Sequence, residues 1–195
     1  AIGRPANGEP PAGADYDMWL GPAPKRPFNP NRFHYNFRWF WDYAGGLMTD
    51  WGVHLINMML MGMGTDYPKT VCSSGGTYLQ NDMRETPDTQ IALYEFPNYM
   101  LVWEHKSGLG IGLNSRPWGV SWSGTEGTIF LNDEGYEIVP ERKKGNLDVK
   151  KVRSSGDPRP AHVRNFLDCV KSRQQPVLDL DYAEDSTCET DMNVV

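Results

Sequence analysis

Residues 89–106 read TQIALYEFPNYMLVWEHK, and this stretch decides the fold class. Apolar and polar side chains alternate over Thr89 to Phe96 and again over Tyr99 to Lys106. This two-residue period is typical of strands that are buried on one face only. Pro97-Asn98 joins the two runs closely enough for a hairpin turn. Because strands joined by so short a turn run in opposite directions, the stretch predicts an antiparallel hairpin.

Further strand patterns lie on both sides of this hairpin. They cover Thr70 to Leu79, Val120 to Ser123, Thr128 to Asn132 and Glu137 to Val139. Turn residues at 124–127 and 133–135 join the last three of these as consecutive hairpins. The charged stretch from Glu141 to Lys151 fits a solvated loop or an edge strand. Together these patterns predict a mostly antiparallel, open β-sheet.

Amphipathic helices accompany the strand patterns. Thr49 or Asp50 can cap a helix that ends near Gly62 or Gly64. A second helical pattern at 161–173 has an apolar stripe made of Val163, Phe166, Leu167 and Val170. We expect that helix to lie across one face of the sheet, and residues 182–195 begin a third helical pattern. The predicted fold class is therefore α+β, with helices packed on one face of the sheet.

Length and composition bound the organisation of the chain and exclude several classes of protein. A length of 195 residues fits a single domain, and the proline- and glycine-rich residues 1–32 predict an extended N-terminal arm. The net charge of −6 argues against a nucleic-acid partner. Leu55 to Met63 is the longest apolar stretch and is too short to span a membrane. The absence of a signal segment leaves the compartment open between the cytoplasm and a bacterial periplasm.

Residues 32–43 read RFHYNFRWFWDY and are unusually rich in rings. One interpretation is a buried aromatic cluster, since aromatic side chains dominate the burial of apolar surface. The other is a wall that stacks against a sugar. In that case Trp39 or Trp41 offers a flat apolar face, and Arg38 or His34 offers hydrogen-bond donors.

Asp50 and His54 are the candidate catalytic residues. Side chains four positions apart lie on one face of a helix, so the carboxylate and the imidazole would converge there. Such a pair suits proton transfer to a hydroxyl group, and Gly52 between them would allow a ligand to approach the helix closely. In the plainer interpretation, Asp50 only caps the helix and His54 is a core histidine.

No metal site and no nucleotide site is predicted within this sequence. The three cysteines, Cys72, Cys169 and Cys188, lack the spacing of a zinc site or a disulfide framework. No third ligand accompanies Asp50 and His54 at a familiar metal-binding spacing. Residues 108–112 resemble a glycine-rich phosphate loop only superficially, because they follow a strand of a hairpin and precede no helix.

The sequence resembles the C-terminal domain of the Gfo/Idh/MocA oxidoreductases over nearly its whole length. The first match is the run Trp19-Leu-Gly-Pro-Ala-Pro24, followed by the aromatic residues 38–42. The second and most specific match is Gly45-Gly46 leading into Asp50-x-Gly52-x-His54. The third is the helical segment 162–172, which begins with His-Val-Arg-Asn and is preceded by the turn at 124–127.

The resemblance implies the substrate half of an oxidoreductase. Its fold would be like the C-terminal domains of dihydrodipicolinate reductase and glyceraldehyde-3-phosphate dehydrogenase, and it would dimerise through the open face of its sheet. A hydride would pass between a carbinol carbon of a sugar, polyol or related carbohydrate and NAD or NADP. His54 would exchange the hydroxyl proton, and Asp50 would orient His54 or hold a neighbouring hydroxyl. The substrate-binding residues would be Arg38, Trp39, Trp41 and His34.

The chain departs from the family by lacking a Rossmann βαβ unit and the Glu-Lys-Pro motif that carries the family's catalytic lysine. We therefore expect that it begins after the interdomain crossover, binds no cofactor by itself and is inert alone. Two alternatives stay open. One is a non-catalytic module that binds carbohydrate or mediates dimerisation, and the other is a nicotinamide-assisted, glycoside-cleaving enzyme of the same family.

Overall fold

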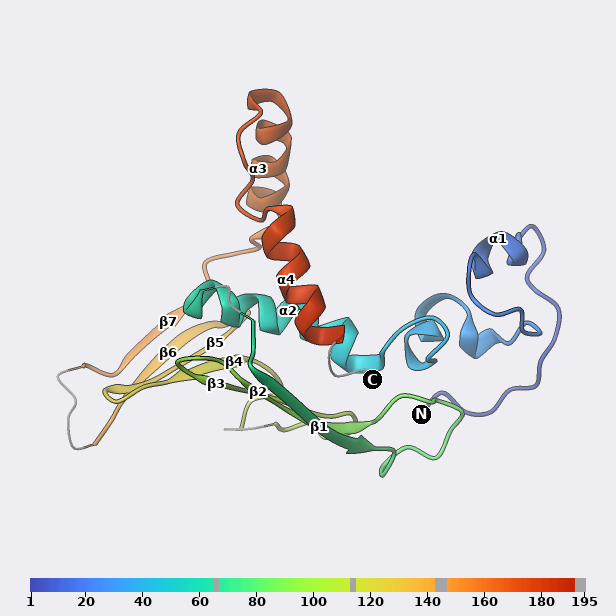
Figure 1. Ribbon diagram of the computed structural model, residues 1–195, viewed down its shortest axis with the longest axis horizontal. Coiled ribbons are helices and arrows are strands. Elements are labelled where there is room, and N and C mark those ends of the chain that lie inside the picture. The colour runs from blue at the N-terminus through green and yellow to red at the C-terminus, as the bar shows by residue number, and fades with distance from the viewer. Residues whose placement is uncertain (65–66, 113–114, 143–146, 192–195) are drawn as a thin grey trace. The chain divides into compact units, whose positions relative to one another are not determined.

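The computed structural model describes residues 1–64, 67–112, 115–142 and 147–191 (Figure 1). The helices are α1 (Tyr16–Leu20), the 3-10 helices η1 (Pro30–Arg32) and η2 (His34–Trp39), α2 (Gly46–Met63), α3 (Arg159–Ser172) and α4 (Leu180–Asp191). The strands are β1 (Thr70–Gly76), β2 (Thr89–Glu95), β3 (Met100–Lys106), β4 (Val120–Ser123), β5 (Gly127–Asn132), β6 (Gly135–Pro140) and β7 (Lys150–Arg153).

The described residues group into two compact units. The first unit consists of residues 1–54, 67–109 and 187–191. The second unit consists of residues 55–64, 110–112, 115–142 and 147–186. That the whole chain forms one domain stays a prediction.

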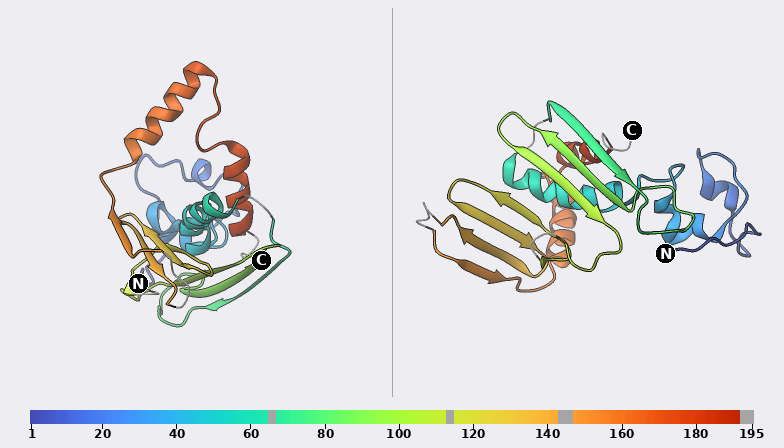
Figure 2. Two further views of the ribbon diagram at one scale, coloured as in Figure 1. Left: turned by 90° about the vertical axis from the view of Figure 1, so that its left-hand side faces the viewer. Right: turned by 90° about the horizontal axis from the view of Figure 1, so that it is seen from below.

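The first unit contains a three-stranded antiparallel sheet in the order β1-β2-β3 (Figure 2). The hairpin predicted at 89–106 is confirmed, with Glu95 opposite Met100 across the turn. Alternate side chains of β2 and β3 are buried, among them Tyr94 and Trp103. The other face of these two strands is exposed. The period of two in the sequence therefore places a core on one side of this sheet only.

The second unit contains a four-stranded antiparallel meander in the order β4-β5-β6-β7. The turns predicted at 124–127 and 133–135 join its first three strands, and β7 pairs with β6 as an edge strand. The edge strand begins at Lys150, at the end of the predicted charged stretch, of which residues 143–146 lie outside the described residues. The α+β class with antiparallel strands is confirmed, and the strands form two hydrogen-bonded sheets.

Helix α2 begins earlier than the capping residues predicted. It starts at Gly46, so Asp50 lies one turn inside the helix and is not its cap. Gly46 has φ +70, and a Cβ there would lie 2.6 Å from the Thr86 side chain. Only glycine fits both the backbone conformation and the close contact. The end at Met63 agrees with the prediction, and no helix within the described ranges has the length and hydropathy that crossing a bilayer requires.

Two helical predictions need correction. The arm is not extended throughout residues 1–32, because the Asp15 side chain accepts a hydrogen bond from the Met18 N–H at 2.9 Å and caps the one-turn helix α1.

Helix α3 does not lie across the sheet of its unit. It stands clear of strands β4 to β7 in Figure 1, and its apolar stripe is exposed, with Phe166 at 59%. An amphipathic pattern predicts an apolar face but not what covers that face.

The arm is held in the first unit by a buried carboxylate. Asp82 accepts a hydrogen bond from the Ile2 N–H at 2.7 Å, and two more from the Arg84 N–H and Nε at 3.0 Å each. Burial by itself raises the pKa of Asp82. The hydrogen bonds from the Arg84 side chain, Ile2 and the Arg84 backbone outweigh burial and lower that pKa to about 2.

We predict that this anchor depends on pH. A carboxylate whose pKa is about 2 in the folded state and near 3.8 otherwise contributes its full stabilisation above about pH 4 and loses it as the pH falls toward 2. Asp82→Asn should lower the free energy of unfolding by about 1–3 kcal/mol at neutral pH. The difference from wild type should shrink below about pH 4.

Thermal unfolding of both proteins across pH 2 to 7 measures this difference. Asp133→Asn, at an exposed turn residue, serves as the control and should unfold like the wild type. A difference between Asp82→Asn and wild type that is the same at every pH would contradict the prediction.

Candidate functional site

An ion pair joins two of the predicted site residues. Arg38 Nη1 lies 2.6 Å from Asp50 Oδ2, and both side chains are largely buried, with 20% and 27% of their surface exposed. The Arg38 guanidinium is held from the other side by Tyr35. Arg38 Nε donates to the Tyr35 carbonyl at 3.0 Å, and Arg38 Cζ lies 4.1 Å from the centre of the Tyr35 ring. Arg38 is therefore positioned to balance the charge of Asp50.

His54 lies one turn beyond Asp50 on the same face of α2. Its side chain is exposed, and no hydrogen bond or ion pair joins it to another residue that the structure describes. The interpretation of His54 as a buried core histidine is therefore wrong. The imidazole is available to solvent and to a ligand, with a fixed carboxylate one helical turn away.

The other three predicted substrate residues lie in and beside η2. Trp39 is half-buried, with the Arg84 Cζ 5.1 Å from the centre of its ring. Trp41 is 45% exposed, and its backbone N–H donates to Glu85 Oε2 at 3.1 Å. His34 is exposed, has φ +49, and packs edge-on against Phe33. The ring-rich segment is therefore part core and part surface, and Phe40 supplies its fully buried member.

Gly52 has a different role from the one predicted. A Cβ at this position would lie 3.1 Å from the Thr190 Cγ2 in α4 and 3.6 Å from the Met48 Cε. Gly52 and Thr190 are both buried. The missing side chain therefore allows close packing between helices within the first unit and does not open α2 to a ligand.

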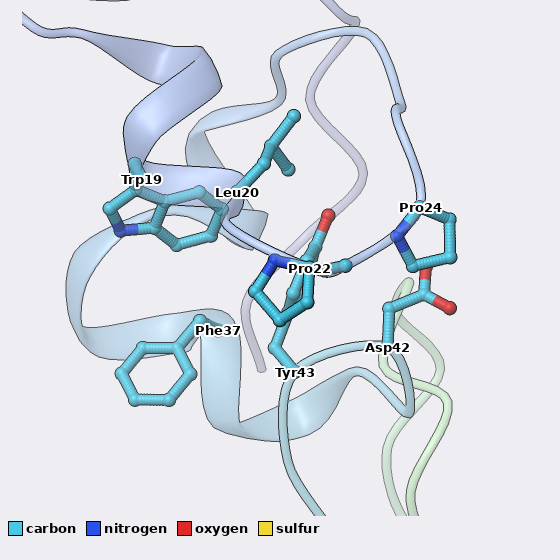
Figure 3. A pocket seen from close by; sticks show the side chains of 8 residues that line it. Trp19, Leu20, Pro22, Pro24, Phe37, Asp42 and Tyr43 are labelled. Carbon is cyan, nitrogen blue, oxygen red and sulfur yellow. The ribbon is translucent and has the colours of Figure 1, made fainter.

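The sequence did not predict a pocket that lies beside this segment. It has a volume of about 500 Å³ and is lined by residues of the arm and of the ring-rich segment, including Trp19, Pro22, Phe37, Asp42 and Tyr43 (Figure 3). Neither Asp50 nor His54 lines it. The sequence feature that could have predicted this pocket is the run Trp-Leu-Gly-Pro-Ala-Pro at residues 19–24. Its prolines and glycine shape a rigid loop around an aromatic ring.

Comparison with known proteins matches the first part of the chain to a family model. Residues 6–84 match the model of the C-terminal alpha/beta domain of the Gfo/Idh/MocA oxidoreductase family. The matched segment contains Arg38, Asp50 and His54, as well as the residues that line the pocket.

Solved oxidoreductase structures share the fold. A protein assigned as an NADPH-dependent oxidoreductase from Desulfitobacterium hafniense has a TM-score of 0.61 and 16% identity, over 82% of this chain and 48% of its own. The aldose-aldose oxidoreductase from Caulobacter crescentus, complexed with glycerol, has a TM-score of 0.59 and 15% identity, over 81% of this chain and 47% of its own. An oxidoreductase from Agrobacterium radiobacter, in complex with NAD+, L-tartaric acid and magnesium, has a TM-score of 0.52 and 15% identity, over 73% of this chain and 44% of its own.

The chain therefore spans about half the length of the structures that it matches. At these identities the structural likeness shows the fold alone, and the likeness to the family rests on residues 6–84. The structural likeness and the family match agree with the sequence resemblance and with the antiparallel α+β architecture. Residues 6–84 of this chain are thus similar to the C-terminal alpha/beta domain of the Gfo/Idh/MocA oxidoreductase family.

Proposed function

We propose that this chain is the substrate-binding domain of an NAD(P)-dependent oxidoreductase that acts on a sugar, a polyol or a related carbohydrate. The observation that carries the proposal is the Arg38–Asp50 ion pair beside an exposed His54 on the same face of α2, within the segment that matches the family. An aldose-aldose oxidoreductase shares the fold, which favours a carbohydrate by analogy.

The described residues of this chain do not fit a dinucleotide site. The glycine-rich residues 108–112 lead from β3 toward β4, where a phosphate loop would lead into a helix. A bound nicotinamide would accept the hydride from the substrate. We propose that NAD or NADP is held by a part of the enzyme outside this chain, and that this chain alone turns over no substrate.

Within this chain, His54 performs the proton step of the proposed reaction. The neutral imidazole accepts the proton of the substrate hydroxyl as the carbinol carbon is oxidised to a carbonyl, and it returns a proton in the reverse direction. Asp50, one turn earlier on the same face of α2, orients His54 or holds a neighbouring hydroxyl group of the substrate. Arg38 fixes the Asp50 carboxylate through the 2.6 Å contact and is a positioning residue. Trp39, Trp41 and His34 contribute ring surface and a donor for the substrate.

His54→Ala in the longer enzyme should lower kcat by about 10²–10⁴-fold, which is the usual contribution of general acid–base catalysis. The fold should be retained, because His54 is exposed and makes no polar contact that the described residues reveal. Steady-state kinetics with the purified enzyme measure the effect. His162→Ala, at an exposed histidine of α3, is the matched control and should turn over normally. Near-normal turnover by His54→Ala would remove His54 from the mechanism.

We also propose that the chain forms a homodimer through the exposed face of the three-stranded sheet. Leu93 and Val102 lie opposite each other on β2 and β3, and Val102 is 57% exposed. Ile91 and Met100 continue this apolar surface at 43% and 64% exposure. Contiguous exposed apolar surface on a sheet is typical of an interaction face.

Sedimentation equilibrium should therefore give twice the mass of the chain, and Val102→Glu should give a single chain, because a charge would be buried at the centre of the interface. Val149→Glu is the matched control. Val149 is 73% exposed in the second unit and lies outside the proposed face, so this variant should remain dimeric. A wild-type protein that sediments only as a monomer at micromolar concentrations contradicts the proposal.

A further inference from the structure

A buried histidine connects strand β3 to the loop before β2. His105 is 6% exposed, whereas the other three histidines of the chain are exposed. The Trp103 Nε1–H donates a hydrogen bond to His105 Nδ1 at 3.0 Å. The other ring nitrogen, His105 Nε2, lies 3.3 Å from the Pro87 carbonyl oxygen. Both nitrogens of the imidazole are therefore engaged inside the first unit.

The two partners determine which nitrogen of His105 carries the proton. An indole N–H can only donate, so Nδ1 is the acceptor and carries no proton. A carbonyl oxygen can only accept, so Nε2 carries the proton and donates to Pro87. The neutral imidazole therefore satisfies both partners, and it does so in one tautomer only.

The protonated imidazole has no place in this arrangement. A second proton on His105 Nδ1 would point at the Trp103 Nε1–H, so that two donors would face each other. The charge would also lie in a site that excludes water. Burial lowers the pKa of His105, and the Pro87 carbonyl and the charge of Asp88 offset that effect only in part.

Asp88 is the charged group that acts on the imidazole, and it is not free to accept the second proton. Its two oxygens accept hydrogen bonds from three backbone N–H groups and from the Thr89 hydroxyl. Directly opposite on β2 lies Gln90, whose side chain is neutral. Glu104 and Lys106 flank the histidine in sequence, but they lie on the exposed face of β3 and pair with each other.

The loop that contains Pro87 also holds the ring-rich segment. The N–H groups of Glu85 and Thr86 donate to the Trp39 carbonyl at 2.9 Å and 3.3 Å. Pro87 follows directly in the chain, so the hydrogen bond from His105 is made at the next carbonyl of the same loop. A change at His105 therefore acts within one residue of the attachment to Trp39.

We infer that Trp103, His105 and Pro87 form a pH-sensitive latch that releases the loop at 82–88 when His105 becomes protonated. The imidazolium leaves its buried position because it finds no acceptor there, and the Pro87 carbonyl then loses its donor. The attachment of the ring-rich segment at Trp39 loosens as a result. Any consequence for catalysis would rest on the proposed function. The test therefore measures backbone exchange without substrate, so that the latch and the proposed reaction can fail separately.

Hydrogen exchange of single amides, measured by NMR on this chain from about pH 7.5 to about pH 4.5, tests the inference. Each rate is divided by the intrinsic rate of that amide at the same pH. The corrected rates of Glu85 and Thr86 should rise at least about tenfold on acidification. The midpoint should lie below pH 6.5 and coincide with the titration of the His105 ring. The amides of Tyr94 and Leu101, further along the hairpin, should not respond.

Two variants distinguish the latch from a general effect of acid. His105→Gln keeps an amide that can accept from Trp103 and donate to Pro87, but it does not titrate. Its corrected exchange rates should be independent of pH. Trp103→Phe removes the donor that opposes protonation, so the midpoint should move to higher pH by about 0.5–1. His162→Ala, at an exposed histidine of α3, is the matched control and should respond like the wild type.

The inference is overturned if the corrected rates of Glu85 and Thr86 in the wild type do not change with pH. A response that persists in His105→Gln would also overturn it, because another group would then cause the change. If His105→Gln does not fold, Trp103→Phe decides, and a midpoint that stays in place or falls contradicts the latch. Asp82 does not contribute in this range, because its pKa of about 2 keeps it ionised at pH 4.5.

Discussion

The arrangement of the site depends on hydrogen bonds to the backbone carbonyl of Trp39. It accepts hydrogen bonds from the Glu85 N–H at 2.9 Å and from the Thr86 N–H at 3.3 Å. One turn of ring-rich chain is thereby fixed to the loop before β2. The Arg84 guanidinium over the Trp39 ring and the absence of a side chain at Gly46 complete the attachment. Because backbone groups make these hydrogen bonds, the attachment survives changes to most of the side chains around it.

The positions of the candidate site and of the pocket both depend on this attachment. On one side of Trp39, Arg38 reaches Asp50 on α2, beside the exposed imidazole of His54. On the other side, residues 40–43 turn so that Asp42 and Tyr43 line the pocket with Trp19 of the arm. The loop at 82–88 is itself fixed by buried carboxylates. Asp88 accepts hydrogen bonds from the backbone of Tyr78, Leu79 and Gln80, and these lower its pKa despite its burial.

The sequence predicted the parts of the fold that depend on local patterns. Three such predictions are confirmed: the hairpin at 89–106, the turns that follow it and the end of α2. Each depends on a period of two in the sequence or on turn residues. The start of α2 was misplaced because Gly46 is required by contact with Thr86, which lies 40 positions away in the sequence. The exposure of α3 and the anchoring roles of Asp82 and Asp88 depend on tertiary contacts, which no local pattern reports. For the same reason the pairing of Arg38 with Asp50 was not predicted, although both residues were named as parts of the site.

The most direct test of the central claim is a crystal structure of the longer enzyme with a nicotinamide nucleotide and a carbohydrate substrate bound. The account predicts a substrate hydroxyl within about 2.6–3.2 Å of an imidazole nitrogen of His54. It also predicts that Asp50 keeps its ion pair with Arg38. A substrate bound away from α2, with the His54 imidazole in solvent, would contradict the account.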